Sequence, residues 1–255
     1  KIYIVGIGPG DRADMTEAAA KVLREADVIV GYTVYLGLLG EEFTRGSKEL
    51  LSTPMRGEKE RAELCFKKAA EGKKVALICS GDAGIYGLAS LMFEMREEYR
   101  RNAGDPVAAA FAAVEPEVIP GITAANSGAA VLGAPLNHDF CTISLSDLLT
   151  PWEYIEKRLL AAAEGDFVIV LYNPASRKRA DYLKRAVEIL MRVLPGDRAC
   201  GYVKNIGREG TECWTGTLFE LGDESVDMFT TVYIGNAESF IADGKLITPR
   251  GYNFI

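Results

Sequence analysis

The chain has 255 residues, of which 48% are hydrophobic and 25% are charged, as is usual for a soluble globular protein. The formal net charge of -7 at pH 7 argues against a broadly basic surface, so we do not expect the protein to bind nucleic acids. A few local Arg and Lys residues can still dominate a cleft, and an anionic small-molecule substrate is therefore compatible with this charge.

The cysteines contain no C-x-x-C pair, and His138 is the only histidine that can join them as a nitrogen ligand. We therefore predict no metal site and reduced core thiols, as in cytosolic proteins. No signal peptide and no membrane-spanning hydrophobic run is visible, which predicts a cytoplasmic protein without a membrane partner. The cysteines are Cys65, Cys79, Cys141, Cys200 and Cys213.

The first half of the chain alternates between predicted strands and helices. A short strand, 1–6, leads through a glycine-rich turn to a helix with Asp14 and Glu17 as a capping pair, and a second strand follows at 27–30. This β-α-β unit predicts a parallel sheet with right-handed crossovers. The further elements expected are strands near Leu50 and at 75–79 and 117–119, and helices at 58–71 and 88–101.

Two glycine-rich loops follow strands of this sheet. In Gly6–Asp11, Asp11 stands where the dinucleotide fingerprint G-x-G-x-x-G requires its third glycine, and a carboxylate there would repel a pyrophosphate. In Ser80–Gly87, three glycines surround Asp82 at the carboxyl end of a strand, where open α/β sheets bind their ligands. We therefore reject dinucleotide binding and predict that Ser80–Gly87 contacts a ligand.

Pro120 and Gly121 mark a turn between two α/β halves, and a helix of small residues is expected at 124–132. A capping box with Thr150 at N-cap, Pro151 at N1 and Glu153 at N3 predicts the start of the next helix. The intervening connection is crowded with polar residues, which indicates that it lines a site. These polar residues are Asn137, His138, Asp139, Ser144, Ser146 and Asp147.

The second half repeats the alternation less regularly. A helix at 152–164, a strand at 167–172 and a long amphipathic helix that turns Leu183 and Leu194 inward precede a strand at 200–203. Two late strands then follow one another without a long helix, at 212–217 and 229–234, which predicts a mixed sheet. We therefore predict two α/β domains, residues 1–119 with a parallel sheet and residues 120–255 with a mixed sheet.

Two polar features have an ordinary and a functional interpretation. His138 adjoins Asp139, which suits a polar pair in a loop better than a Ser-His-Asp triad. The basic set Arg177, Lys178 and Arg179 is more typical of a solvated helix start than of an anion site.

Several stretches together resemble the tetrapyrrole methylase family, the two-domain S-adenosylmethionine-dependent enzymes of cobalamin and sirohaem synthesis. These stretches are GIGPGD, DVIVGY, SGDAGIYG, PGITAAN and TTVYIGN, and they extend over essentially the whole chain. The segments GAPLNHDFCTISLSDLLTPWE and VLYNPASRKR are similar to the members that methylate carbon 17 of a precorrin and contract its ring.

The resemblance implies that S-adenosylmethionine, with S-adenosylhomocysteine as its product, lies folded in a cleft between the two domains. By this similarity the residues that line the cofactor are Gly81, Asp82, Ile85, Tyr86, Thr123, Ala124, Tyr172, Asn173 and Thr231 or its neighbour Thr230. The turn Gly8-Pro9-Gly10 would lie under a trough for the small-molecule tetrapyrrole. Plausible clamps for the macrocycle carboxylates are Arg56, Lys204, Arg208 and Arg250. Family members are usually homodimers.

The implied reaction is a direct displacement, which alignment in a desolvated cleft can accelerate without a protein nucleophile. Ring contraction also requires proton movement, for which Asp11, His138 and Asp147 are the candidates. Two alternatives remain open. One is a family relative that modifies a macromolecule, such as a ribosomal RNA ribose methylase. The negative net charge of the chain argues against this alternative. The other is a noncatalytic nucleotide-binding protein, which would not bind S-adenosylhomocysteine.

Overall fold

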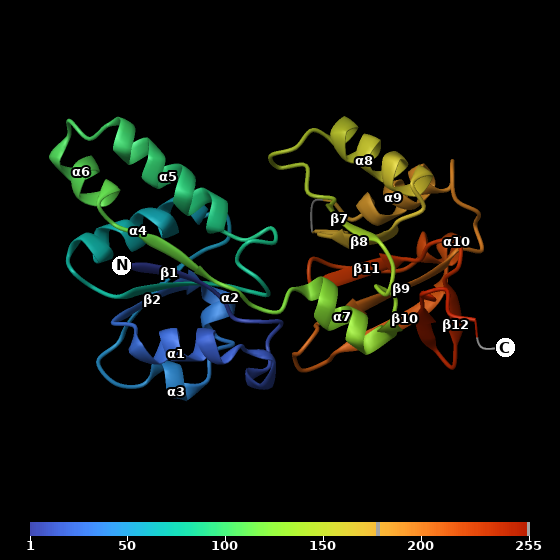
Figure 1. Ribbon diagram of the computed structural model, residues 1–255, viewed down its shortest axis with the longest axis horizontal. Coiled ribbons are helices and arrows are strands. Elements are labelled where there is room, and N and C mark those ends of the chain that lie inside the picture. The colour runs from blue at the N-terminus through green and yellow to red at the C-terminus, as the bar shows by residue number, and fades with distance from the viewer. Residues whose placement is uncertain (177–178, 254–255) are drawn as a thin grey trace. The chain divides into compact units, whose positions relative to one another are not determined.

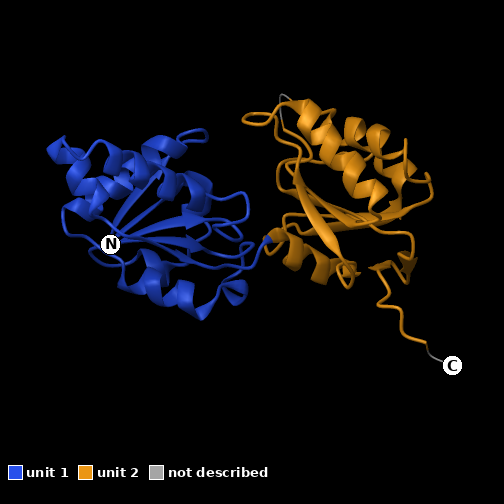
Figure 2. Ribbon diagram, turned by 45° about the horizontal axis from the view of Figure 1, so that its top comes forward, with its two compact units in different colours: residues 1–123 blue, residues 124–255 orange. Residues whose placement is uncertain are grey.

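The computed structural model describes residues 1–176 and 179–253, which form two compact units (Figure 2). Unit 1 comprises Lys1–Thr123 and unit 2 comprises Ala124–Ile255. The turn residues at 120–123 belong to unit 1. Thr16 Oγ1 donates to the Pro120 carbonyl at 3.2 Å, and the Gly121 amide donates to Asp82 at 2.9 Å.

Unit 1 is built on a five-stranded sheet with the order β3-β2-β4-β1-β5. Every pairing in it is parallel, which confirms the sheet type predicted from the β-α-β pattern. The strands are β1 (Ile2–Gly6), β2 (Val28–Tyr32), β3 (Glu49–Thr53), β4 (Val75–Cys79) and β5 (Pro116–Ile119).

Helices cover both faces of this sheet (Figure 1). One face packs against α4 (Glu58–Ala70), α5 (Ala89–Arg101) and α6 (Pro106–Ala112), with Phe66 and Met92 fully buried. The other packs against α1 (Glu17–Glu25) and α3 (Glu41–Thr44), and a further short helix is α2 (Thr33–Leu36). The sequence missed α6 because its alanine-rich residues carry no clear apolar period.

The predicted cap of α1 is wrong. Thr16, and not Asp14, is the N-cap, since its hydroxyl accepts from the Ala19 amide at 3.1 Å. Asp14 instead lies in a short 3₁₀ helix, η1 (Arg12–Asp14), which Asp11 caps. This extra turn delays the start of α1.

Unit 2 contains a second five-stranded sheet with the order β10-β9-β11-β8-β7. Its β7–β8 pair is parallel and its other pairs are antiparallel, so the predicted mixed sheet is confirmed. The strands are β7 (Phe140–Ser144), β8 (Val168–Tyr172), β9 (Ala199–Lys204), β10 (Glu212–Thr217) and β11 (Thr230–Ile234).

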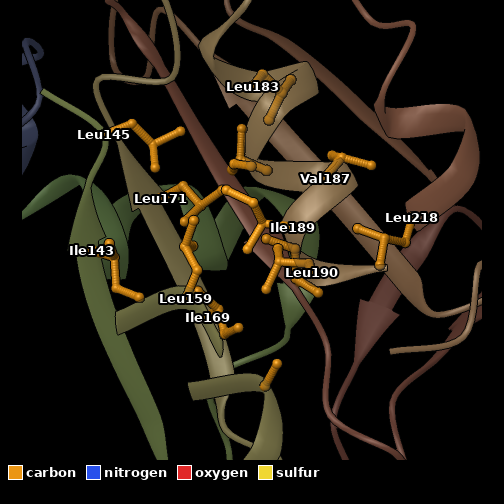
Figure 3. Packing of buried hydrophobic residues seen from close by; sticks show 14 of the residues in the cluster. Ile143, Leu145, Leu159, Ile169, Leu171, Leu183, Val187, Ile189, Leu190 and Leu218 are labelled. Atoms are coloured by element: carbon orange, nitrogen blue, oxygen red, sulfur yellow. The ribbon is translucent and has the colours of Figure 1, made fainter. Parts of the chain in front are cut away.

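One face of this sheet packs against α8 (Trp152–Glu164), α9 (Tyr182–Leu190) and α10 (Leu218–Leu221). Figure 3 shows Ile143 and Leu171 of the strands near Leu159 and Leu190 of the helices, and Leu183 belongs to the same cluster. Burial of these aliphatic side chains, at roughly 1.5–3 kcal/mol each, dominates the stability of this unit.

The other face of the sheet packs against α7 (Ala124–Leu132), the helix of small residues that was expected at 124–132. Ala125 and Leu132 are buried against this face, and the buried Tyr233 hydroxyl donates to the carbonyls of Ala124 at 2.7 Å and Ala125 at 2.9 Å. Burial raises the pKa of Tyr233, so the phenol stays protonated and keeps donating to the first turn of α7.

The capping box predicted for α8 is also wrong. The helix begins at Trp152, with Pro151 in an extended conformation as its N-cap and no side-chain cap. A small sheet of β12 (Phe240–Ala242), β13 (Lys245–Ile247) and β6 (Gly133–Ala134) was not predicted. Strands of two or three residues are too short to show a period.

Candidate functional site

In unit 1, three loops meet at the carboxyl ends of the adjacent strands β4, β1 and β5. Gly8 and Gly81 exchange two backbone hydrogen bonds, of 3.1 Å and 2.7 Å. A Cβ on Gly6 would lie 2.7 Å from both the Gly121 nitrogen and the Gly81 oxygen. Gly81 has a φ of 69°, in the left-handed region that favours glycine. We call residues 6–11, 80–87 and 120–123 the unit 1 loop cluster.

Asp82 holds this cluster together. One carboxylate oxygen accepts from the Gly84 amide at 2.7 Å within its own loop, and the other accepts from the Gly121 amide at 2.9 Å. The carboxylate therefore bridges two loops that are far apart in the sequence. Asp82 thus fixes the conformation of Ser80–Gly87, the loop predicted to bind the cofactor.

The same loop presents apolar side chains to solvent. Ile85 is 41% exposed and Tyr86 is 51% exposed, and Tyr86 adopts a φ of 54°, which is uncommon for a residue other than glycine. Strained backbone and exposed apolar side chains are frequent where a loop is shaped for a ligand. The loop geometry therefore supports the prediction for Ser80–Gly87.

In unit 2, the ends of the parallel neighbours β7 and β8 form a second group. The Tyr172 hydroxyl accepts from the Ala125 amide at 2.8 Å, so the end of β8 is tied to the start of α7. The Asn173 side chain, at a φ of 54°, donates to Ser144 Oγ at 2.9 Å. We call Ala124, Ser144, Tyr172 and Asn173 the unit 2 strand-end group. Thr230 and Thr231 are 2% and 4% exposed and offer a ligand little surface.

The predicted clamps for carboxylates lie on three separate segments of the chain, Arg56 in unit 1 and the others in unit 2. Lys204 and Arg208 share a strand end and its loop: Lys204 pairs with Asp227 at 3.1 Å, and the Arg208 guanidinium lies 5.1 Å from the Phe229 ring centroid. The hydrogen bond to Asp227 raises the pKa of Lys204, so the ammonium group of this residue stays protonated. Arg250 donates to the Asn137 carbonyl at 3.3 Å, and Arg56 is exposed in a turn of unit 1.

Each candidate for proton transfer already forms hydrogen bonds. Asp11 accepts from the Ala13 amide at 2.7 Å as the cap of η1. His138 is exposed, and its Nδ1 accepts from the Asp139 amide at 2.9 Å, the local contact expected of a polar loop residue. Asp147 pairs with Arg179 Nε at 2.7 Å. Arg179 is therefore not part of a solvated helix start, and that interpretation is wrong for it.

The other two members of the basic set, Arg177 and Lys178, lie outside the described residues. Sequence reasoning placed Gly6 and Gly121 in turns but missed their close contact with each other and with Gly81, and it missed Tyr182 as a partner of Asp147. Their roles depend on contacts across long separations in the chain, for which a single sequence has no local signal.

The cysteines do not supply a nucleophile in the core. Burial raises the pKa values of Cys65 and Cys200, and raises that of Cys79 to about 11, so these thiols stay protonated. Cys213 is exposed on β10, contrary to the expectation of core thiols. Among the described residues, no group of three or more His, Cys, Asp or Glu side chains is placed to hold a metal. Within residues 1–176 and 179–253, no helix is long and apolar enough to cross a membrane.

The chain matches known proteins along nearly its full length. Residues 1–222 match the family of Tetrapyrrole (Corrin/Porphyrin) Methylases. A probable cobalt-factor III C(17)-methyltransferase of Salmonella typhimurium is 46% identical over 98% of this chain and 99% of its own length. A precorrin-3B C(17)-methyltransferase of Sinorhizobium is 38% identical over 98% of this chain and 96% of its own. A cobalt-factor III methyltransferase of Priestia megaterium is longer, and this chain spans 45% of it.

Solved structures agree with the fold described above. The methyltransferase CobJ superposes with a TM-score of 0.88 at 36% identity, over 97% of this chain and 99% of that one. A uroporphyrin-III C-methyl transferase from Thermus thermophilus, complexed with S-adenyl homocysteine, has a TM-score of 0.65 at 18% identity over 92% of each chain. At 18% identity, the likeness to the Thermus thermophilus structure shows a shared fold and nothing more.

Proposed function

Since the chain belongs to the tetrapyrrole methylase family, we propose that it transfers a methyl group from S-adenosylmethionine to carbon 17 of precorrin-3B or its cobalt complex. The product would be precorrin-4 or its cobalt form, in cobalamin biosynthesis. The observation that carries this proposal is the 46% identity, over 98% of the chain, to a probable cobalt-factor III C(17)-methyltransferase. The higher identity to that relative than to the precorrin-3B enzyme, at 38%, favours the cobalt-containing substrate.

In the proposed reaction a new bond forms between carbon 17 and the methyl carbon, while the bond from that carbon to sulfur breaks and its electron pair stays on sulfur. Bound S-adenosylmethionine supplies an electrophilic methyl group, so the protein needs no nucleophile of its own. Its contribution is to bind both reactants, align them and exclude water, which can supply most of the acceleration. The raised pKa values of the buried thiols agree with a mechanism that does not use them.

We assign cofactor binding to the loop 80–87 and to the unit 2 strand-end group. The Ser80–Gly87 loop is fixed by the bonds of Asp82, and Ile85 and Tyr86 offer apolar surface for the adenosine. Tyr172 and Asn173 are fixed by their bonds to Ala125 and Ser144. Calorimetry should show that S-adenosylhomocysteine binds at one site per chain. If adenine nucleotides bound and S-adenosylhomocysteine did not, the alternative of a noncatalytic nucleotide-binding protein would be favoured.

Replacing Lys204 by Gln should raise the KM for the tetrapyrrole by roughly 10-fold, because a charge-assisted bond to a macrocycle carboxylate is lost. This rise in KM is at the low end of what the loss of a charge-assisted hydrogen bond causes, because Lys204 also pairs with Asp227. The matched control is Arg192→Gln, which removes another cation of unit 2 that pairs with Glu156 at 2.6 Å. Equal KM values in the two variants would remove Lys204 from the substrate site.

We propose Asp11 and His138 as the groups that move protons during ring contraction. Both lie in loops, and among the residues that the structure describes no charged partner lies closer to either side chain than Asp139 does to His138, at 3.9 Å. Variants Asp11→Asn and His138→Gln should release more methylated but uncontracted product, as measured by mass spectrometry. Contraction at the wild-type rate in both variants would exclude them.

We also propose that the protein acts in the cytoplasm as a homodimer, as members of the family usually do. Light scattering on the purified chain should give twice the monomer mass. A monomer that is fully active would contradict this assignment.

A further inference from the structure

The loop Leu145–Pro151, which joins β7 to α8, carries an exposed apolar tip. Leu145 at its start is fully buried and points into the core of unit 2 (Figure 3), whereas Leu148 is 55% and Leu149 is 98% exposed. Figure 1 shows this segment extending outward from the sheet and helices of its own unit. Two adjacent leucines held in water at the end of a loop are a feature of contact surfaces rather than of packing.

An ion pair holds the middle of the loop in place. The Asp147 carboxylate pairs with Arg179 Nε at 2.7 Å and accepts a hydrogen bond from the Tyr182 hydroxyl at 2.5 Å. The Asp147 side chain is 31% exposed and that of Arg179 only 19%, so water weakens this pair less than it weakens a surface pair. The bond to Asp147 also raises the pKa of Tyr182. We call Asp147, Arg179 and Tyr182 the Asp147 clasp.

Both ends of the loop are fixed as well. At its start, the Leu145 amide donates to the Tyr172 carbonyl at 2.9 Å. At its end, the Trp152 ring packs against Tyr182 with 4.7 Å between centroids, and the Arg185 guanidinium lies 4.0 Å from the Trp152 ring centroid. The contacts of Leu145, Asp147 and Trp152 thus hold both ends and the middle of the loop, and the apolar tip lies between the last two of them.

Building on the proposed function, we propose that Asp147 is a positioning residue that holds Leu148 and Leu149 against the flat, apolar face of the tetrapyrrole. The loop thereby becomes a determinant of substrate specificity. The loop leaves β7 at Ser144, whose hydroxyl is bonded to Asn173 in the unit 2 strand-end group. Since we assign that group to the cofactor, the tetrapyrrole that receives the methyl group would lie next to it, within reach of the loop. The Asp147 carboxylate, bound to a guanidinium, is then an anchor and not a base for ring contraction.

The test of the clasp is Asp147→Asn, which preserves the shape of the side chain and removes its charge. We expect the KM for the tetrapyrrole to rise about 10-fold, with S-adenosylhomocysteine affinity within twofold of wild type. Hydrogen exchange of residues 145–151 should speed up in the ligand-free protein. Adding Arg179→Gln to Asp147→Asn should cause little further change, because the two residues act through one contact. The control Glu156→Gln breaks an ion pair between α8 and Arg192, just after α9, and should alter neither KM nor loop exchange.

The test of the tip is the double variant Leu148→Ala, Leu149→Ala. Its KM for the tetrapyrrole should rise about 10-fold with unchanged thermal stability, while the control Phe219→Ala, which trims another exposed apolar residue of unit 2, should leave KM unchanged. An unchanged KM in an active double variant overturns the specificity role and leaves the proposed function standing. Loss of a dimer in that variant, with normal KM, would make the tip an interface between copies. Absence of tetrapyrrole methylation by the wild-type protein would instead overturn the proposed function, and with it the role of the tip.

Discussion

Replacing Gly121 by Ala should destabilise unit 1 and abolish measurable cofactor binding. A Cβ at this position would lie 2.2 Å from the Gly81 oxygen and 2.6 Å from the carbonyl carbon and oxygen of Gly6. All three are backbone atoms and cannot move aside as a side chain would. The loops after β4, β1 and β5 must therefore separate, at a cost of about 1–3 kcal/mol or more, as for other overpacked sites. Thermal unfolding and calorimetry with S-adenosylhomocysteine measure the two effects.

The control for this substitution is Gly104→Ala, in the turn after α5. No atom lies within 4 Å of the Cβ that it would add. We expect its stability and cofactor affinity to match those of the wild type. Normal cofactor binding by Gly121→Ala would show that close contact of the three loops is not required for the site.

Replacing Asp82 by Asn should weaken S-adenosylhomocysteine binding by roughly 10- to 150-fold, the equivalent of about 1.5–3 kcal/mol. The carboxylate accepts from the Gly84 amide at 2.7 Å and from the Gly121 amide at 2.9 Å. An Asn side chain has one acceptor oxygen, so one of these amides would face the NH₂ group and lose its partner. The bridge between the two loops is thus broken at one end, and the Ser80–Gly87 loop loses its fixed shape.

A matched control separates this effect from a general loss of stability. Asp105 also accepts from a backbone amide in unit 1, that of Ala108 at 2.9 Å, where it caps α6. Asp105→Asn should lower the melting temperature slightly and leave cofactor affinity unchanged. If Asp82→Asn and Asp105→Asn bound S-adenosylhomocysteine equally well, Asp82 would have no role in the cofactor site.

Local signals predicted the sheets of this protein well. The strands 75–79 and 212–217 were expected with the bounds that the structure shows for β4 and β10, because each lies between clear turn or loop residues. The parallel and mixed sheet types followed from whether a helix separates consecutive strands. The helices at 124–132 and 152–164 were also expected with the bounds of α7 and α8. The capping residues Asp14 and Thr150 were wrong, since a cap depends on where the preceding chain leaves its extended conformation.

The residues assigned to the candidate site stay predictions, and the contacts among its loops could not be predicted from the sequence. The glycines of the Ser80–Gly87 loop were expected to let its backbone lie against a ligand, and the bonds that the structure shows between Gly81 and Gly8 were not foreseen. The sequence could not identify Gly121 as the partner of Asp82, or Arg179 and Tyr182 as the partners of Asp147. These pairs are 39, 32 and 35 residues apart, and they meet only when the sheets have formed.

The proposed methylation is tested most directly by incubating the purified chain with isotope-labelled S-adenosylmethionine and either precorrin-3B or its cobalt complex. We expect the tetrapyrrole product to gain one labelled methyl group at carbon 17 and to carry a contracted ring, with the cobalt complex converted faster. Mass spectrometry with fragmentation identifies both changes. Unmodified tetrapyrrole in both incubations, with the labelled methyl group still on the cofactor, would contradict the proposed function.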